Sequence, residues 1–506
     1  MMTTKITNLM ILLVMGLGMG ISPATASPQR LLLQERVDPW VLETAQVGET
    51  EFLIFLSQQA DLRQAATLPT KLDKGEFVYR ALRTFAEQTQ KPILEKLNAL
   101  GISHRSYWAA NVIWAKGDLG DVEVIAKLPE VAHLYANPKI RLESPEDFSP
   151  IGLSAISLGL EWNIHLVNAD DVWAAGFIGQ GAVVGGADTG YDWMHPALIN
   201  QYRGWDGNTV NHNYNWHDAV HTDITGGGNP CGFNLQEPCD DRSHGTHTMG
   251  IMVGDDGAGT QIGMAPGARW IGCRNMEEGV GTPISYIECY QWFIAPTDLN
   301  DANPDPSKAP DVINNSWYCP PEEGCTDPNI LLTVVNNVRM AGILTVHSAG
   351  NQGPSCSTIR YAAGMYDASF TVGNTTSDDK IYSSSSRGPV IADDIGRIKP
   401  DVSAPGTGIR SSIPGGIYAT MSGTSMAAPH VAGLAALLIS ARPELRGQVD
   451  LIEQIIAYSA IPKTSEDGCG GLPASAIPNN TYGWGRIDAW RAFTFKFLFH
   501  LPYVAR

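Results

Sequence analysis

Residues 423–433 have the sequence GTSMAAPHVAG, and this stretch decides how the rest of the chain is interpreted. A turn of small residues carries one serine and leads directly into an apolar segment. Within and just after it, four apolar residues recur at helical spacing: Ala427, Val431, Leu434 and Leu438. The spacing predicts a helix with one face packed into a core.

The start of this predicted helix places Ser425 where backbone N–H groups have no helical partners. Those amides and the positive end of the helix dipole stabilise negative charge that develops beside them. Pro429 falls in the first turn or two, where its missing N–H does least harm. Ser425 therefore has the position of a nucleophile, although a serine that only caps the helix would give the same local pattern.

The composition is that of a well-solvated protein with room for more than one domain. At 506 residues the chain is long enough for two or three domains with a large core. Its 34 basic and 52 acidic residues give a formal net charge of -18, which argues against nucleic acid as a partner. The 52 glycines cluster in turns after short apolar runs, as expected of an α/β sheet with functional loops.

The first residues have the features of an export signal. Lys5 precedes an apolar run over residues 9–20, and small residues at 24–26 suit cleavage before Ser27. The run is short for a membrane span, although an uncleaved anchor is the alternative. Since no later segment approaches a spanning length, we expect the processed protein to be secreted and to lack a membrane span.

The eight cysteines of an exported chain are expected to form disulfides rather than to bind metal. No Cys-x-x-Cys pattern occurs, which argues against a zinc or redox site. The sequence does not determine the pairing. The simplest arrangement leaves Cys356 and Cys469 over and joins the cysteines that are close along the chain: Cys231 with Cys239, Cys273 with Cys289, and Cys319 with Cys325.

The segment from about Glu51 to Glu143 has a pattern of its own, with strands and helices in the order βαββαβ. Such a segment is a small α+β unit of the ferredoxin-like type and can fold as a separate domain. Its predicted elements are a strand at 51–57, a helix at 77–100 interrupted near Pro92, one or two strands at 104–114, a helix at 119–128 and a strand at 131–135.

In the second half of the chain, short apolar strands end in polar residues. The run GAVVGGA suits a parallel strand buried on both faces, and Asp188 follows at its carboxyl end. Similar strands end near Ser316 and near Asn351, with a predicted crossover helix at 328–340 between them, and His244 opens another helix. This alternation predicts an α/β fold with a mostly parallel sheet flanked by helices and one site along its carboxyl edge.

An acid after one strand, a histidine opening one helix and a serine opening another are the parts of a nucleophilic triad. A serine hydroxyl is protonated at neutral pH, so Ser425 needs a base within hydrogen-bond reach. His244 would take the proton, while Asp188 would fix the tautomer of the ring and stabilise the imidazolium. The backbone N–H of Ser425 and the side-chain amide of Asn351 would donate to the oxyanion.

Three sequence blocks, DTG at Asp188, HGTH at His244 and GTSMAAPH around Ser425, carry a resemblance to a known family. In this chain order they resemble the subtilisin-like serine peptidases, since chymotrypsin and the α/β-hydrolases have other orders. NNSW at 314–317, together with the block at His244, is most similar to the bacillopeptidase F branch. The resemblance covers about Glu161 to Ala492 and implies a subtilisin-like fold for that part.

By the same resemblance, the segment upstream is similar to the propeptide of the family, although by pattern rather than by motif. It would assist folding, occupy the substrate groove as an inhibitor and be removed by self-cleavage. The polar, proline-bearing residues 144–150 suit a linker or a cleavage site. We therefore expect the mature amino terminus to lie between Asn137 and Glu161.

The resemblance also assigns roles to the residues that match the family pattern. Asp188 is implied to be the acid of the triad, His244 the base and Ser425 the nucleophile, with Asn351 as the oxyanion amide. Two further histidines and one turn are interpreted as structural rather than catalytic: His247, His430, and the turn that contains Asp192 and His195.

Substrate binding is implied for Ser316, Trp317 and Gly350, where an extended peptide would pair backbone to backbone. The aromatic rings of Trp317 and Tyr318 would either line the pockets for substrate side chains or pack the wall behind them, and both alternatives stay open. Gln352 is uncharged, so this wall gives no sign of a trypsin-like preference.

The chain departs from the family pattern at two places. Ala197 stands where many subtilisins have a calcium-binding aspartate, so that metal site is expected to be absent, and no cofactor is expected for the chemistry. Acidic residues at Asp223, at 240–241 and at 298–305 are alternative sites for a structural calcium ion, but they lack the spacing of calcium ligands. Residues 203–240 lengthen the interval between acid and histidine, and we interpret them as a disulfide-braced insertion near the cleft.

The sequence thus predicts a signal peptide at 1–26, a propeptide at 27–150, a subtilisin-like catalytic domain at 151–495 and a short tail at 496–506. The expected function is that of a secreted, monomeric serine endopeptidase that acts on proteins or peptides and is inhibited by its own propeptide. The alternatives are a catalytically silent scaffold of the same shape, and an esterase or lipase, against which the missing Gly-x-Ser-x-Gly argues.

Overall fold

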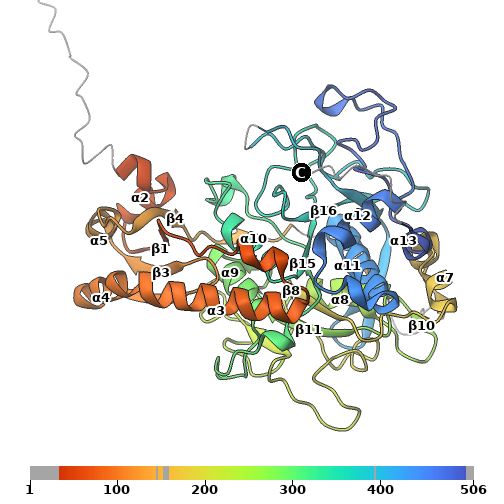
Figure 1. Cartoon of the computed structure of the whole chain (residues 1–506), viewed down its shortest axis with the longest axis horizontal. Helices are drawn as coiled ribbons and strands as arrows, with labels where there is room; N and C mark the ends of the chain where they lie inside the picture. Colours follow the sequence, from red (N-terminus) through yellow and green to blue (C-terminus); the bar gives the residue numbers. More distant parts are fainter. Residues whose placement is uncertain (1–32, 144–145, 152–158, 393–394, 497–506) are drawn as a thin grey trace, which may run out of the picture.

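The computed structural model of the chain describes residues 33–143, 146–151, 159–392 and 395–496. The predicted export signal and nearly all of the predicted tail lie outside these residues. Figure 1 shows a smaller amino-terminal part beside a larger part that carries the main sheet, with the long helix α3 (Lys71–Thr89) running from the first toward the second.

Residues 33–143, called the N-terminal unit below, contain a four-stranded antiparallel sheet in the order β2-β3-β1-β4. The predicted βαββαβ order is confirmed, with shifted boundaries. Instead of one interrupted helix there are two, because the chain turns at Gln90 and Pro92 takes an early position of the second. Before α3 come α2 (Pro39–Ala45) and β1 (Thr50–Leu56), and after it come α4 (Lys91–Leu100), β2 (Ser103–Tyr107), β3 (Val112–Gly117), α5 (Leu119–Ala126) and β4 (Val131–Ala136).

The larger part is built on a seven-stranded parallel sheet in the order β17-β16-β15-β14-β8-β11-β9. The predicted α/β class is therefore confirmed. The three central strands β8, β14 and β15 end side by side. Asn315, the last residue of β14, pairs with Ala187 near the end of β8 and with His347 near the end of β15. The strands are β8 (Val183–Asp188), β9 (Trp216–Asp218), β11 (Arg269–Arg274), β14 (Val312–Asn315), β15 (Leu344–Ser348), β16 (Phe370–Thr375) and β17 (Val402–Pro405).

Helix α11 (Thr424–Ala441) occupies the centre of one face of this sheet, beside α8 (His244–Val253). The sequence predicts one packed face, but every residue from Thr424 to Ile439 is buried. Gly433 permits this, because a Cβ atom there would lie 2.4 Å from the Cβ of Met264. By length and hydropathy α11 could also span a membrane, but most of its residues are buried inside the protein.

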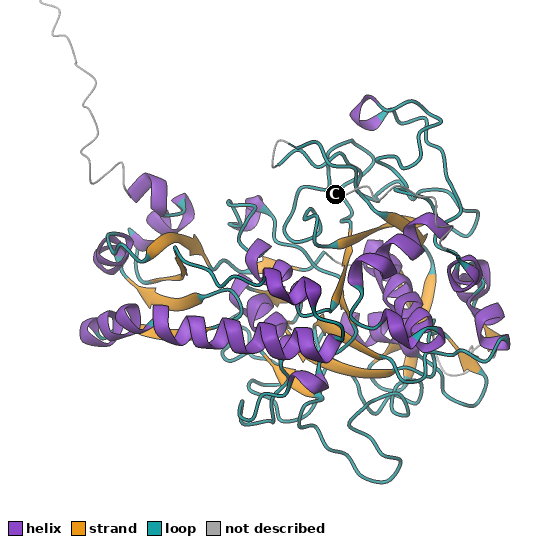
Figure 2. Cartoon of the chain, viewed as in Figure 1, coloured by secondary structure: helices purple, strands orange, loops and turns teal. Residues whose placement is uncertain are grey.

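The other face of the sheet carries α9 (Pro283–Ile294) and α10 (Leu332–Met340), and the N-terminal unit packs on these two helices. Val78 and Leu82 of α3 belong to the same buried apolar cluster as Ile287 and Val334. Figure 2 shows the N-terminal strands and α3 adjoining this side of the molecule. The two parts therefore share a hydrophobic core.

Short elements complete the larger part. They are β7 (Gly159–Leu160), α6 (Trp162–Leu166), α7 (Ala169–Ala174), β10 (Thr260–Gln261), β12 (Met276–Glu277), β13 (Val280–Gly281), β18 (Ile409–Ile413), β19 (Ile417–Ser422), α12 (Val449–Ser459) and α13 (Ala489–Thr494).

Part of the stretch at 144–150, which the sequence predicts to be a linker or a cleavage site, forms a strand. Before it, β5 (Ile140–Arg141) pairs antiparallel with β13. The strand itself, β6 (Glu146–Ile151), pairs antiparallel with β19, whose partner on its other side is β18. The proline of the stretch does not prevent strand formation, because β6 is an edge strand and proline is tolerated at a sheet edge.

Four disulfides join all eight cysteines of the chain, as the export signal and the even number predict. Three of them close the short intervals of the simplest arrangement, and the fourth joins Cys356 to Cys469. The pair Cys231–Cys239 closes the end of the insertion at 203–240. The pair Cys273–Cys289 ties β11 to α9, the helix on which the N-terminal unit packs.

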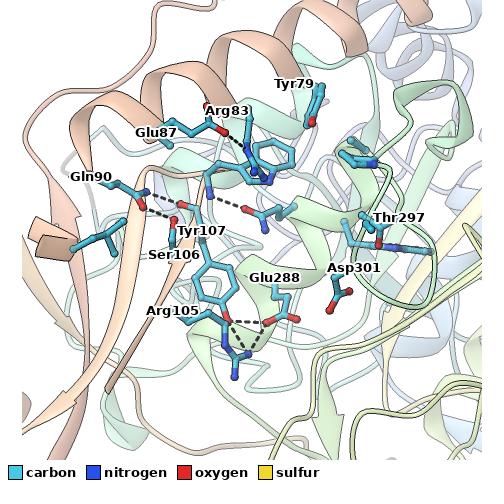
Figure 3. Close-up of a pocket in the computed structure, with 18 of the residues that line it drawn as sticks. Tyr79, Arg83, Glu87, Gln90, Arg105, Ser106, Tyr107, Glu288, Thr297 and Asp301 are labelled. Atoms are coloured by element: carbon cyan, nitrogen blue, oxygen red, sulfur yellow. Dashed lines mark hydrogen bonds and ion pairs between the residues drawn. The ribbon is translucent and has the colours of Figure 1, made fainter. Parts of the chain in front are cut away.

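A cavity of about 950 Å³ lies between the N-terminal unit and α9, and Figure 3 shows the residues that line it. Glu288 on its floor accepts hydrogen bonds from Tyr107 of β2 at 2.8 Å and pairs with His217 at 2.9 Å and His221 at 2.8 Å. His217 also contacts Asp301 at 3.3 Å. None of the predicted site residues lines this cavity.

The contacts of His217 with Glu288 and Asp301 predict that the protein becomes less stable at alkaline pH. Burial lowers the pKa of His217, but hydrogen bonds and charge from Asp301 and Glu288 outweigh it and raise the pKa from 6.5 to about 9. The folded protein thus keeps a proton that the unfolded chain loses, so stability is complete below pH 6.5 and is lost as the pH rises through 9. The loss is on the order of 2–3 kcal/mol.

The measurement is chemical unfolding of the Ser425→Ala variant, which lacks the expected nucleophile, at pH 6.5 and at pH 9.5. The double variant with His217→Gln supplies the control for all other titrations. We expect the free energy of unfolding to fall more steeply with pH when His217 is present. Parallel pH profiles for the two proteins would refute the assignment.

Candidate active site

Asp188 is the last residue of β8, and its carboxylate is held by three groups. Thr189 N donates to Oδ1 at 2.8 Å, Thr248 Oγ1 donates to Oδ2 at 3.2 Å, and His244 Nδ1 lies 2.7 Å from Oδ1. The side chains of Asp188 and His244 are each 1 % exposed. Because a buried carboxylate accepts hydrogen bonds only, the contact fixes the proton of neutral His244 on Nδ1 and leaves Nε2 as an acceptor.

His244 is the first residue of α8, and Asp240 fixes where that helix begins. The Asp240 carboxylate accepts hydrogen bonds from the backbone N–H groups of Ser243 and Thr246 at 2.9 Å each, and from Thr189 Oγ1 at 2.8 Å. Asp240 thereby holds the residue after Asp188 and the start of α8 in one network. No sequence pattern indicates this role, because Asp240 lies outside the helix and Ser243 is the residue at the N-cap position.

Ser425 is the second residue of α11 and is 9 % exposed. Its hydroxyl lies 3.3 Å from the carbonyl oxygen of Ser316, and Ser316 Oγ in turn donates to the carbonyl of Ser425 at 3.0 Å. His244 Nε2 is buried and has no hydrogen-bond partner. The structure therefore shows the contact between Asp188 and His244 but no hydrogen bond between His244 and Ser425.

Asn351 is tied to the same end of α11. Its Oδ1 accepts from Thr424 N at 2.9 Å and from Thr424 Oγ1 at 3.0 Å, which leaves the Nδ2 hydrogens to donate elsewhere. Gly350 N donates to Thr424 Oγ1 at 3.1 Å. Gly350 has a φ of 95°, which favours glycine, and a Cβ atom there would lie 2.7 Å from Gln352 Oε1.

Trp317 lies in the core rather than in an open pocket. It is 2 % exposed, its ring stacks on Tyr286 with centroids 3.9 Å apart, and Nε1 donates to the carbonyl of Ala187 at 3.0 Å. Of the two alternatives for this side chain, packing of the wall is the one the structure favours. Tyr318 is half-buried, stacks on Tyr361, and lies with its hydroxyl 3.2 Å from Gln352 Nε2.

The other histidines near the helices have the structural roles expected of them. His247 Nε2 lies 3.1 Å from the carbonyl of Ala419, and burial lowers its pKa to about 3. His430 lies 2.9 Å from the carbonyl of Met426 and 2.8 Å from Asn163 Nδ2, and burial lowers its pKa to about 4. Both rings are therefore neutral at physiological pH and serve to join elements.

The turn that contains Asp192 and His195 is likewise hydrogen-bonded on both sides. Asp192 accepts from Gly415 N at 2.9 Å, and His195 bridges Ala197 N at 3.1 Å and the carbonyl of Ile417 at 2.9 Å. Ala197, which follows this turn closely, is buried. Within the described residues no group of three or more His, Cys, Asp or Glu side chains is arranged to hold a metal ion.

Known proteins resemble this chain in sequence over most of its length. The family described as Peptidase_S8, subtilase family, matches residues 179–485, which include all of the predicted site residues. Bacillopeptidase F of Bacillus subtilis (strain 168) is 36% identical over 457 residues, covering 86% of this chain and 30% of that protein. This similarity supports the bacillopeptidase F-like branch that the sequence blocks indicate.

Two further relatives from Bacillus subtilis (strain 168) match shorter stretches. Serine protease AprX is 34% identical over 283 residues, which are 50% of this chain and 58% of the relative. Subtilisin E is 30% identical over 285 residues, which are 56% of this chain and 61% of the relative. The alignments thus span between 30% and 61% of these three curated relatives. Since the family match covers more than half of this chain and includes its three sequence blocks, the chain belongs to the subtilase family.

Proposed function

We propose that the chain is a secreted serine endopeptidase that hydrolyses peptide bonds through Asp188, His244 and Ser425 and is made as a self-processed precursor. The observation that carries the proposal is the buried Asp188–His244 contact of 2.7 Å, with an unpartnered Nε2 on the same ring. An imidazole held in this way keeps Nε2 free to accept a proton. It can therefore act as a general base and take the proton of a serine hydroxyl.

The reaction follows from these positions. The Ser425 hydroxyl turns from the Ser316 carbonyl to His244 Nε2, gives up its proton and attacks the substrate carbonyl. Asp188 stabilises the imidazolium. The backbone N–H of Ser425 and Asn351 Nδ2 donate to the oxyanion, and the amide nitrogen leaves with the proton from His244. Water then hydrolyses the ester in the same way.

The proposed substrate groove is bordered by backbone N–H and C=O groups that can form hydrogen bonds with an extended chain. β13 offers one edge, and the segment from Ser316 to Tyr318 offers the other, so an extended chain adds a strand between them. In this groove Ser316, Trp317 and Gly350 contribute through their backbone, because the Trp317 ring is buried. The predicted propeptide already occupies the β13 edge with β5, which supports its role as an inhibitor.

Export and processing are proposed on independent grounds. The export signal at 1–26 is a sequence feature, and four disulfides suit an oxidising compartment. The proposed domains are the propeptide at 27–150, the catalytic domain at 151–495 and the tail at 496–506. We propose that self-cleavage leaves a mature, monomeric enzyme whose amino terminus lies between Asn137 and Glu161.

The triad is tested with a fluorophosphonate probe and with casein hydrolysis. We expect the wild type to be labelled and active, and Ser425→Ala to be neither. His244→Ala should lose about 10⁶ in turnover, the loss known for the corresponding histidine of subtilisin. His165→Ala, at an exposed histidine, is the matched control and should keep its activity.

Undiminished hydrolysis by His244→Ala would refute the base assignment. A folded wild type that is neither labelled nor active would favour the silent scaffold. Faster cleavage of plain alkyl esters than of peptides would favour the esterase alternative.

The oxyanion role of Asn351 is tested with two variants. Asn351→Asp keeps the acceptor for Thr424 but loses the Nδ2 donor, while Asn351→Ala loses both. We expect each to lower kcat about 10²–10³-fold with a much smaller change in KM, as measured for the oxyanion asparagine of subtilisin. If Asn351→Asp keeps wild-type turnover, the side-chain amide does not stabilise the transition state.

A further inference from the structure

Strands β5 and β6, which come before and after Glu143 in the chain, each pair with a strand near the proposed site. On one side, Ile140 and Arg141 of β5 pair with β13, and Leu142 N donates to the carbonyl of Gly279 at 2.7 Å. On the other side, β6 pairs with β19, whose last residue lies three positions before Ser425. Glu143 is the residue that follows the first of these pairings.

The carboxylate of Glu143 contacts the wall of the site at three side chains. Asn351 Nδ2 donates to Oε2 at 3.2 Å, and Gln352 Nε2 donates to Oε1. Tyr318 is hydrogen-bonded to the same carboxylate; burial and the negative charge of Glu143 both raise the pKa of its hydroxyl. Asn351, Gln352 and Tyr318 are all uncharged, so neutral donors hold the carboxylate at these three contacts.

The two amides can present only their N–H groups to this position. Asn351 Oδ1 is occupied by two donors from Thr424, and Gln352 Oε1 accepts from Ser386 Oγ at 3.2 Å. Ser386 Oγ also accepts from Gln352 N at 3.0 Å. Since an amide flip would break these contacts, both nitrogens point at the Glu143 carboxylate.

A pocket wall made of donors discriminates among side chains by chemistry. A carboxylate only accepts hydrogen bonds and satisfies every donor, whereas a glutamine places its own NH₂ against one of them. A leucine leaves the donors buried and unpaired, at a cost of about 10–100-fold in binding. A lysine has no acceptor at all. The wall therefore favours glutamate at the position that Glu143 occupies.

We propose that Glu143 is the residue after which this chain cleaves itself, and that Gln352, with Tyr318, selects glutamate at the same subsite in other substrates. The inference rests on the proposed endopeptidase function and names its substrate class. Ser425 Oγ forms an ester with the carbonyl carbon of Glu143, and the bond from that carbon to the next nitrogen breaks. His244 passes the Ser425 proton to the leaving amine, and water then releases Glu143 as a free carboxylate.

The first test measures specificity with the processed enzyme, quantified by fluorophosphonate titration. Peptides with the sequence of residues 140–151 carry Glu, Gln, Leu or Lys at the position of Glu143. At pH 7, we expect kcat/KM for the glutamate peptide to exceed the others by at least about 10-fold. Gln352→Glu keeps the shape but turns a donor into a charged acceptor, so the ratio of glutamate to leucine should fall by about 100-fold.

Gln236→Glu is the matched control, because it adds the same charge on an exposed loop and should leave this ratio unchanged. Cleavage that favours leucine or lysine would overturn the inference and leave the endopeptidase function intact. An enzyme that takes up no fluorophosphonate and cleaves none of the peptides would instead refute the proposed function itself.

The second test reads the cleavage site directly. The full-length Ser425→Ala chain is incubated with processed wild-type enzyme, and the new amino terminus is sequenced. We expect it to begin at Ser144, and we expect Glu143→Lys in that chain to slow the cut by at least about 10-fold, with Glu143→Gln between the two. A cut at another bond, or faster processing of Glu143→Lys, would show that Glu143 only blocks the site and would overturn the proposal.

Discussion

The burial of α11 from Thr424 to Ile439 is the constraint on which the rest of the molecule depends. A helix surrounded by protein on every side has no face along which it can shift, so the sheet and α8 together fix the position of Ser425. Thr424 joins the helix start to Asn351 at the end of β15. The placement of the Ser425 hydroxyl is thus a result of core packing, and little of this residue is exposed.

The opposite face of the sheet has a different role. There α9 and α10 share a buried apolar cluster with the N-terminal unit, and the buried Glu288 joins Tyr107 of that unit to His217 and His221. The cost of burying these charges is offset by their mutual pairing, which makes this interface sensitive to changes in protonation. Docking of the N-terminal unit therefore depends on a polar cluster as well as on apolar area.

Much of this arrangement could be predicted from the sequence, because strand, turn and helix signals coincide at the motifs. Asp188, His244 and Asn351 each follow or open an element whose period is clear, and the structure places those elements as expected. The N-terminal βαββαβ order was predictable for the same reason. Short-range patterns carry this information, since alternation and helical spacing are local.

What the sequence could not give depends on contacts between distant segments. Residues 144–150 resemble a linker, yet part of them forms β6, because a strand at a sheet edge is specified by its partner rather than by its own composition. Trp317 is buried because Tyr286, thirty-one positions earlier along the chain, supplies a stacking surface. The direction of the Ser425 hydroxyl is a rotamer choice, and no sequence pattern encodes it.

The two strand pairings on either side of Glu143 have a consequence for the energetics of a cut in this segment. With β5 held on β13 and β6 held on β19, the newly formed amine stays tethered beside the acyl carbon at a high effective concentration. Religation then competes with hydrolysis until one strand detaches. After the proposed cut, the rate at which the cleaved form becomes permanent is set by dissociation of a strand. The hydrogen bonds between β6 and β19 would slow that step independently of the chemistry.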